Sequence, residues 1–237
     1  MKAVILAAGM GKRLQEVSGG LPKSMIKIGN SSIIHHQLKS CINVGIRDYV
    51  IVLGYKKEQL KSHILELIKS ENVTFVENPI YDKTNTLYSL WLTSDFLNDD
   101  FIYFNADVLF QSGLLKKISA QSKFSQLLLE TKSCAEEEVK MIIDDQMRIL
   151  EIGKKIPIKQ CAGEFIGIGK FNKEVIKEFV YYLQKGVDEG QSNNYFEYAV
   201  NLLVKDNILL AKPTDDIPCI EIDFPADLKR AKEMFSL

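Results

Sequence analysis

The sequence has almost no net charge and no apolar run long enough to span a membrane. Lysine and arginine number 30 against 31 aspartates and glutamates, which gives a formal charge of -1. Such a balanced chain offers no global field to nucleic acid or to an anionic membrane, so we expect neither as a partner. The first apolar run extends only from Ala3 to Ala8. We interpret it as a buried strand, and we expect no signal peptide and a cytoplasmic location.

Cysteine and histidine are also scarce. The four cysteines are scattered without a CxxC pair, which argues against a zinc site and against a disulfide framework. The three histidines lie in amphipathic stretches, and no Ser/His/Asp or Cys/His combination stands out. The sequence therefore gives no sign of a protein nucleophile, and we expect the cysteines to be reduced thiols.

The first half of the chain alternates apolar runs with amphipathic stretches. Hydrophobic residues make up 46% of the sequence and charged residues 26%, which is typical of a globular protein. The alternation predicts an α/β fold, with a mostly parallel central sheet and helices on both faces. The expected strands are 2–6, 49–53, 73–76 and 101–104, and the expected helices are 33–44, 57–68 and 85–97.

Beyond residue 120 the rhythm changes. Two β-like runs, 139–143 and 148–152, flank the acidic turn at Asp144 and Asp145, which predicts a β-hairpin. Further strands are expected at 125–131, 163–169, 208–211 and 219–222, and further helices at 172–184, 195–204 and 225–235. Because no linker or repeat separates the halves, we expect one domain, residues 1–237, in which the second half elaborates the first.

A glycine-rich loop follows the first predicted strand, where open α/β sheets hold their ligands. It reads Ala7-Ala8-Gly9-Met10-Gly11-Lys12-Arg13-Leu14, so backbone amides can approach an anion and two cations stand behind them. It is neither a P-loop nor a dinucleotide fingerprint, because GxxxxGK[ST] and the third glycine are absent. Lys23, stiffened by Pro22, could bring a third cation to the same place. A packing turn beside an exposed lysine is the alternative.

Two acidic residues follow predicted strands that lie far apart in the sequence. Asp107 comes directly after the strand at 101–104, and Asp223 ends the run Ile220-Glu221-Ile222-Asp223. Carboxylates at strand ends suit Mg²⁺, which prefers oxygen ligands and shares phosphate oxygens, so the two could meet on one magnesium ion. A turn or cap role for Asp107 and an N-cap role for Asp223 are the alternatives.

The glycine loop and the segment at 22–25 together resemble the opening of the sugar-nucleotidyltransferase superfamily. The family pattern is LAAGxGxRL followed by a PKxL-like segment, and this chain has LAAGMGKRL and PKSM. The resemblance implies a single-domain, Rossmann-like nucleotidyltransferase fold whose loop wraps the nucleotide. It implies that Arg13 and Lys23 neutralise the triphosphate, that Asp107 and Asp223 hold the metal, and that Arg13, Lys23 and Asp107 are the catalytic residues.

Two further segments resemble a subgroup, the bacterial phosphocholine and aminoalkylphosphonate cytidylyltransferases. Residues 78–90 read NPIYDKTNTLYSL and residues 163–168 read GEFIGI. Taken alone, the first is a helix capped by Thr84 or Asn85. The resemblance implies CTP as the nucleotide, bound between the glycine loop and this segment. The expected nucleotide-binding residues are Leu6, Ala7, Ala8, Gly9, Gly11, Lys12, Arg13, Lys23, Thr84 and Asn85.

The acceptor-binding residues are expected in the second half. Lys154 is a candidate for the phosphate near the reacting centre, although a solvated lysine pair in a hairpin explains it equally well. Glu164, Tyr195 and Glu197 could form an acceptor pocket, because a carboxylate suits an amine or amide and an aromatic ring covers methylenes. The single tryptophan, Trp91, lies in a predicted core helix, which counts against a choline cage and leaves a primary amine or a phosphorylated amide at least as suitable.

These expectations describe a CTP-dependent cytidylyltransferase that transfers CMP to a small phosphorylated or phosphonylated acceptor and releases pyrophosphate. Its relatives feed the decoration of bacterial surface polymers such as capsules. Positioning and charge neutralisation would carry the catalysis, because an acceptor phosphate is already ionised. The alternatives are a sugar-1-phosphate nucleotidyltransferase that uses UTP, dTTP or GTP, and a regulatory module that binds nucleotide without chemistry. The acceptor, the pathway and a homodimer stay open.

Overall fold

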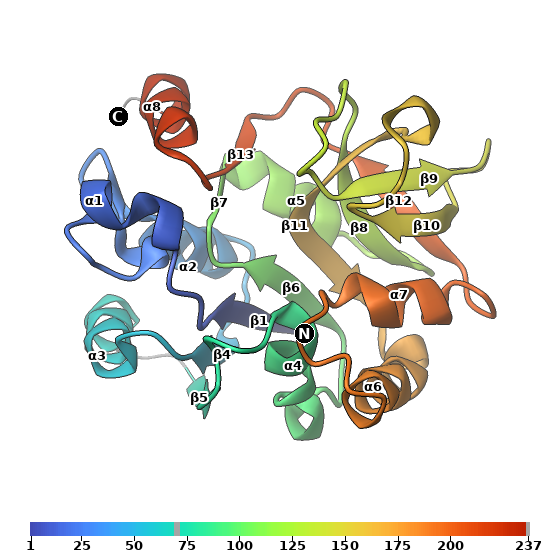
Figure 1. Ribbon diagram of the computed structural model, residues 1–237, viewed down its shortest axis with the longest axis horizontal. Helices are drawn as coiled ribbons and strands as arrows, with labels where there is room; N and C mark the ends of the chain where they lie inside the picture. The colour runs from blue at the N-terminus through green and yellow to red at the C-terminus, as the bar shows by residue number, and fades with distance from the viewer. Residues whose placement is uncertain (69–71, 236–237) are drawn as a thin grey trace.

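The computed structural model describes residues 1–68 and 72–235, and its strands form one large sheet and two small ones (Figure 1). The large sheet contains β1 (Lys2–Ala7), β4 (Asp48–Leu53), β5 (Asn72–Glu77), β6 (Phe101–Asn105), β8 (Ser125–Glu130), β9 (Lys140–Ile143), β10 (Ile149–Gly153), β11 (Gly163–Phe171) and β12 (Leu209–Pro213). The small sheets pair β2 (Lys27–Ile28) with β3 (Ser31–Ser32) and β7 (Val108–Phe110) with β13 (Cys219–Glu221).

The large sheet is parallel in its first half and mixed in its second. Its main order is β10-β9-β11-β6-β1-β4-β5, with β8 beside β11 and β12 beside β8. β1 runs parallel to β4 and to β6, so the carboxyl ends of these strands leave the sheet at one edge. β11 pairs antiparallel with β6, and β9 and β10 form the antiparallel hairpin that the acidic turn predicts. The predicted α/β architecture is therefore confirmed.

Helices cover both faces of this sheet. They are α1 (Gln15–Ser18), α2 (Ile33–Asn43), α3 (Lys57–Leu67), α4 (Thr86–Trp91), α5 (Ser112–Ser119), α6 (Lys173–Asp188), α7 (Glu197–Leu203) and α8 (Pro225–Met234), with 3-10 turns at Lys12–Leu14, Lys23–Met25, Ser94–Phe96 and Ile158–Gln160. The buried residues of α2, α3 and α5 pack in one core, and those of α4, α6 and α7 pack in a second core. Within the described ranges, no helix is long and apolar enough to cross a membrane.

The strand β1 shows how one short run supplies both cores. Ala3, Ile5 and Ala7 belong to the core beneath α2, α3 and α5. The alternate residues of the run, Val4 and Leu6, belong to the core beneath α4, α6 and α7. This division follows from the period of two along a strand, and it explains why an uninterrupted apolar run predicts a central strand.

Two local predictions need correction. The helix expected at 85–97 is the shorter α4 followed by the 3-10 turn at Ser94–Phe96. The hydroxyls of Thr93 and Ser94 each donate to a main-chain carbonyl, of Leu90 and Trp91 respectively, at 2.6 Å. Hydroxyl side chains that bond their own backbone compete with the helical ladder, so the regular helix ends there. The strand β7 and the helix α5 were not predicted, although the apolar residues of α5 have helical spacing.

The last segment of the chain returns to the middle of the molecule. β13 pairs with β7, so that Glu221 lies opposite Val108, and the amide of Ile222 donates to the carbonyl of Asp107 at 3.1 Å. A third small core holds α8 against the glycine loop and β7, and Figure 1 shows α8 beside α1. The residues after β13 are thereby fixed next to the residues after β6.

Candidate active site

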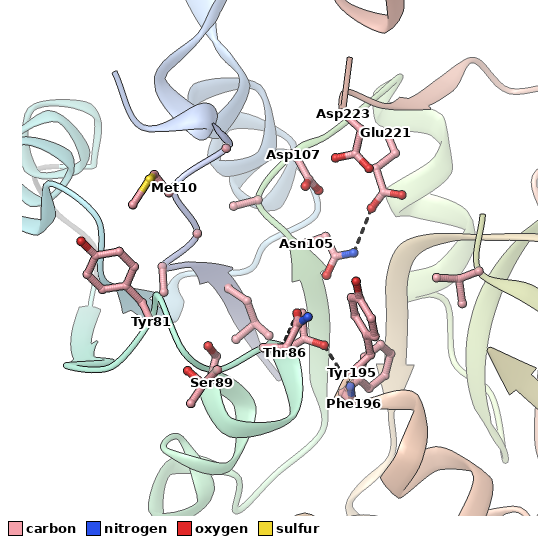
Figure 2. Close-up of a pocket in the computed structure, with 18 of the residues that line it drawn as sticks. Met10, Tyr81, Thr86, Ser89, Asn105, Asp107, Tyr195, Phe196, Glu221 and Asp223 are labelled. Atoms are coloured by element: carbon pink, nitrogen blue, oxygen red, sulfur yellow. Dashed lines mark hydrogen bonds between the residues drawn. The ribbon is translucent and has the colours of Figure 1, made fainter. Parts of the chain in front are cut away.

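A cleft of about 510 Å³ opens at the carboxyl ends of β1 and β6. Its walls come from the glycine loop, the segment before α4, the start of α7 and the end of β13. Figure 2 shows Met10 and Tyr81 on one side, Tyr195 and Phe196 on the other, and the carboxylates at one end. Most of the predicted site residues line it: Leu6, Ala8, Gly9, Gly11, Lys12, Arg13, Thr84, Asn85, Asp107, Lys154, Tyr195, Glu197 and Asp223.

The glycine loop is held in place by close backbone packing. Gly11 adopts the left-handed conformation with φ 60°, and a Cβ there would lie 2.9 Å from the Cβ of Lys23. Gly54 approaches the loop from the end of β4, where a Cβ would lie 2.6 Å from the carbonyl oxygen of Ala8. Glycine is required at both places, because an L side chain would be strained at the first and would collide at the second. The loop therefore presents its backbone to the cleft in a fixed shape.

The two predicted carboxylates meet on one ammonium group. The ammonium of Lys23 donates to Oδ2 of Asp107 at 2.7 Å and to Oδ1 of Asp223. Burial alone would lower the pKa of Lys23, but Asp107 and Asp223 together raise it well above its ordinary value. Burial likewise opposes the ionisation of Asp223, yet Lys23 holds the pKa of that carboxyl below its usual range. Asp107 and Asp223, which lie 84 and 200 positions after Lys23 in the sequence, thus form a single charged group with it.

Arg13 adds a second cation to this group. Its guanidinium stands 4.5 Å from the centre of the Phe224 ring and 4.0 Å from carboxylate oxygens of Asp223 and Glu137. The Arg13 side chain is 52% exposed, so it is free to move toward an anion in the cleft. Lys23 and Ala7 border a smaller hollow of about 140 Å³, which shares Gly9, Gly11 and Asp107 with the cleft.

The carboxylate pair has the donor set that a magnesium ion requires. Oδ1 of Asp107 is buried and has no hydrogen-bond partner among the described residues, so one lone-pair site is left for a cation. No group of three or more His, Cys, Asp and Glu side chains suited to a metal occurs in the described part of the chain. Mg²⁺ is usually bound by one or two carboxylates, with phosphate oxygens and water completing the shell. Asp107 and Asp223 fit that pattern.

Behind the carboxylates lies a partly buried chain of hydrogen bonds whose residues were not assigned to the site from the sequence. The hydroxyl of Tyr103 donates to Oδ1 of Asn105 at 2.5 Å, and the amide of Asn105 donates to Oε1 of Glu221 at 3.0 Å (Figure 2). Burial, and then the charges of Asp107 and Asp223, raise the pKa of Glu221 well above its ordinary value. This chain orients the floor of the cleft. The sequence contained a signal for two members of this chain, because Asn105 and Glu221 each lie two positions before a predicted carboxylate, Asp107 or Asp223.

The segment before α4 forms a compact, hydrogen-bonded wall. The amide of Asn78 donates to the hydroxyls of Thr84 at 3.0 Å and Ser89 at 3.1 Å, and Oδ1 of Asn85 accepts from the backbone of Thr86 at 2.9 Å. Asn85 is therefore the N-cap of α4, as one interpretation of the sequence holds. Thr84 and Asn85 also border the cleft, so the cap and the cleft wall are the same residues.

Three of the four predicted acceptor residues lie together, and the fourth does not. Lys154 stands over the ring of Tyr195, 4.9 Å from its centre, and Glu197 follows on the same wall. Glu164 lies on β11 outside the cleft lining, where its carboxylate accepts from Lys132 at 2.6 Å. Pairing of β11 with β8 and β9 directs this side chain to the turn at 131–139. We therefore remove Glu164 from the acceptor set.

Several cleft residues were not assigned to the site from the sequence. They are Met10, Tyr81, Asp82, Thr86, Ser89, Tyr103, Asn105, Ala106, Glu137, Val139, Phe196 and Glu221. Most of them lie beside a residue that was named, so their position in the motifs could have indicated them. Glu137 and Val139 are different, because they reach the cleft from the turn before β9, and only the three-dimensional fold places this turn beside the glycine loop.

Comparison with known proteins agrees with this geometry. The family described as Nucleotidyl transferase matches residues 2–202. The CTP:phosphoglutamine cytidylyltransferase of Campylobacter jejuni is 29% identical, over 97% of this chain and 98% of that protein. The choline-phosphate cytidylyltransferase of Streptococcus pneumoniae is 25% identical, over 99% and 98%. The solved inositol-1-phosphate CTP transferase from T. maritima superposes with a TM-score of 0.84 at 24% identity, over 99% and 94%. The chain belongs to the Nucleotidyl transferase family.

Proposed function

We propose that this nucleotidyltransferase is a cytidylyltransferase, which transfers CMP from CTP to a small phosphorylated or phosphonylated acceptor and releases pyrophosphate. The observation that carries the proposal is that Lys23 bonds both Asp107 and Asp223, and that these two carboxylates line the cleft beside the glycine loop. Cytidylyl transfer in particular is supported by relatives that match this chain along nearly its whole length.

The reaction is an in-line displacement at the α-phosphorus of the nucleotide. An oxygen of the acceptor phosphate forms the new bond to phosphorus, the bond to the β-phosphate oxygen breaks, and pyrophosphate leaves with that electron pair. The loop backbone with Lys12 and Arg13 would hold the triphosphate, and Lys23 would reach the reacting centre from behind the loop. No proton has to be removed from an ionised phosphate, so positioning and neutralisation of charge are sufficient.

We further propose that Asp107 and Asp223 hold Mg²⁺ when the nucleotide binds. A magnesium ion there would supply charge neutralisation of the triphosphate oxygens. For Asp223 to bind the ion, Lys23 has to release one of its two carboxylates and turn toward the phosphates. The Lys23 ammonium is joined to both carboxylates by hydrogen bonds, and the base of the side chain packs closely against Gly11.

The proposed acceptor site is the wall formed by Lys154, Tyr195 and Glu197, and its Tyr195 faces the glycine loop across the cleft. Lys154 lies within electrostatic reach of both Asp223 and Glu197, because its charge lowers the pKa of each carboxyl. A phosphate bound beside Lys154 would thus lie between the metal-binding carboxylates and the acceptor wall. The identity of that acceptor decides the pathway of the product, including a role in surface-polymer decoration.

The test is a panel of nucleotides and acceptors. The purified protein is incubated with Mg²⁺, one of CTP, UTP, dTTP, GTP or ATP, and one of several phosphorylated amines, amides or sugars, and pyrophosphate is measured. We expect release with CTP and mass detection of a CDP-linked product. Preference for UTP, dTTP or GTP with a sugar 1-phosphate would replace the proposal by a sugar nucleotidyltransferase. Binding of CTP without turnover of any acceptor would indicate a silent regulatory module.

A further inference from the structure

One wall of the cleft contains a buried carboxylate oxygen without a hydrogen-bond partner. Glu197 is 6% exposed at the start of α7 and lines the cleft. Its Oε2 is buried and accepts no hydrogen bond from any of the described residues. Such an atom has lost water without gaining a donor, which is uncommon in native proteins and calls for a physical explanation. In a binding cleft, the missing donor is a feature that a ligand can supply.

The polar neighbours of Glu197 direct their donors elsewhere. Burial, and then the charge of Glu197, raise the pKa of Tyr103. The Tyr103 hydroxyl nevertheless donates its proton to Asn105. The ammonium of Lys154 lies over the face of Tyr195. Burial raises the pKa of Glu197 to about 7, while its own backbone N–H and the charge of Lys154 act in the opposite direction. The carboxylate is therefore close to its ionisation point and lacks a strong partner.

We infer that Glu197 binds an N–H group of the acceptor, so that the acceptor is a phosphorylated or phosphonylated compound with an amine or amide N–H. This inference rests on the proposed transfer reaction and narrows its substrate class. A quaternary ammonium carries no hydrogen to donate, and it is usually bound against aromatic faces. Lys154 already covers one face of Tyr195 with a cation. A sugar phosphate offers hydroxyl donors instead of N–H donors, so its turnover beside that of an N–H acceptor decides between these two classes.

The first test compares acceptors that differ only in their N–H groups. Phosphoethanolamine and phosphocholine share a phosphate and a two-carbon spacer, and 2-aminoethylphosphonate can be paired with its N-trimethyl analogue in the same way. With CTP and Mg²⁺, we expect kcat/KM to be at least about tenfold higher for the N–H member of a pair, because a site built around a hydrogen bond rejects an analogue that lacks the donor. Equal values, or a preference for the methylated member, would overturn the inference.

The second test changes the carboxylate. In Glu197→Gln, KM for the N–H acceptor should rise at least about tenfold while KM for CTP stays unchanged, and Glu197→Met should lose the discrimination between paired acceptors. Glu151→Gln is the matched control, because Glu151 is exposed on β10 and outside the cleft lining. Thermal melts confirm that each variant is folded. Equal losses for CTP and acceptor would show a merely structural role and would contradict the inference.

The two levels of proposal fail differently. If inositol 1-phosphate or phosphocholine is the better acceptor and a CDP product forms, the cytidylyltransferase stands and the role of Glu197 is refuted. If pyrophosphate is released only with another nucleotide, the proposed function itself is refuted. The comparison of acceptors in the wild-type protein needs no variant, so the inference remains testable even if substitution at Glu197 prevents folding.

Discussion

At the scale of single residues, the site depends on charges that are arranged before any ligand arrives. Asp107 and Asp223 share Lys23, and Oδ1 of Asp107 still lacks a partner. Substitution of a paired charge and substitution of an unpaired buried charge should therefore have different effects. Removal of a group that works only on substrate should affect turnover, whereas removal of a buried group without a partner should affect stability.

The first residue-scale prediction concerns the carboxylate pair. Asp107→Asn and Asp223→Asn should each lower kcat by at least ~100-fold, because each removes a charge that would hold the proposed metal next to the triphosphate. Far-UV circular dichroism should stay unchanged, since asparagine keeps the size of aspartate. Asp216→Asn is the control, because Asp216 is exposed in the turn before β13. Turnover at the wild-type rate in either site variant would remove that residue from the metal site.

The second residue-scale prediction uses the raised pKa of Glu197, from an ordinary value of 4.5 to about 7. Between these values, the folded chain keeps a proton that the unfolded chain releases, so this residue lowers stability progressively as the pH rises. Once both states are ionised, the cost is on the order of 3 kcal/mol. Glu197→Gln removes the cost. Thermal melts without ligand should therefore show the variant more stable than the wild type at pH 8 and the difference narrowing toward pH 5.

At the scale of elements, the turn at 131–139 is held by lysines from outside the cleft. Lys140 is only 1% exposed, and its ammonium donates to the carbonyls of Glu136 at 2.8 Å and Glu138 at 3.0 Å. The same turn brings Glu137 into the cleft lining and to within 4.0 Å of Arg13. The shape of one cleft wall therefore depends on a residue that does not touch the cleft.

This dependence gives a prediction for Lys140→Met. Loss of the ammonium removes charged hydrogen bonds to the carbonyls of Glu136 and Glu138, which should lower the free energy of unfolding by about 2 kcal/mol. Amide hydrogens of 131–139 should exchange faster, and KM for CTP should rise, because the wall loses its fixed position. Lys159→Met is the control, since Lys159 is exposed in a neighbouring 3-10 turn. Unchanged amide exchange rates at 131–139 would contradict the conclusion that Lys140 holds this turn in place.

Local patterns predicted those elements whose information is also local. The strand at β1, the glycine loop and the cap at Asn85 are encoded by neighbouring residues, so the sequence identified them. The position of Glu164 depends on strand pairing: β11 shifts its register against β8 between Phe165 and Gly169, and its two ends meet different partners. No spacing along the chain reveals which neighbour such a side chain faces. Glu164 and Glu197 were therefore alike as acceptor candidates in the sequence, whereas in the structure only Glu197 lines the cleft.

At the scale of the whole molecule, β11 joins the two halves. It pairs with β6 of the first half and with β8 and β9 of the second, and Gly167 lets it approach Asn105 so closely that a Cβ would lie 2.8 Å from the amide nitrogen. Both large cores also take residues from strands of both halves. Neither half has a core of its own.

The expectation of one domain therefore becomes a prediction about unfolding. Heat or urea should unfold the chain in one cooperative transition, with circular dichroism and the fluorescence of Trp91 changing together and with equal calorimetric and van't Hoff enthalpies. A fragment that ends before β8 should not fold, because β6 would lose its neighbour β11 and the sheet would gain an open apolar edge. Two separated transitions would contradict the prediction. A homodimer stays a separate question for light scattering.

The position of Lys23 has a consequence for how the protein is made. Because the Lys23 ammonium bonds both Asp107 and Asp223, the folded chain supplies its own counterion for these two carboxylates. Folding, including the pairing of β13 with β7 that brings Asp223 beside Asp107, therefore does not require a divalent ion. A chelator should inactivate the enzyme without denaturing it. If Asp107 and Asp223 hold magnesium as proposed, Lys23 would compete with the ion for both carboxylates, so the apparent affinity for magnesium should depend on the nucleotide that draws the lysine away.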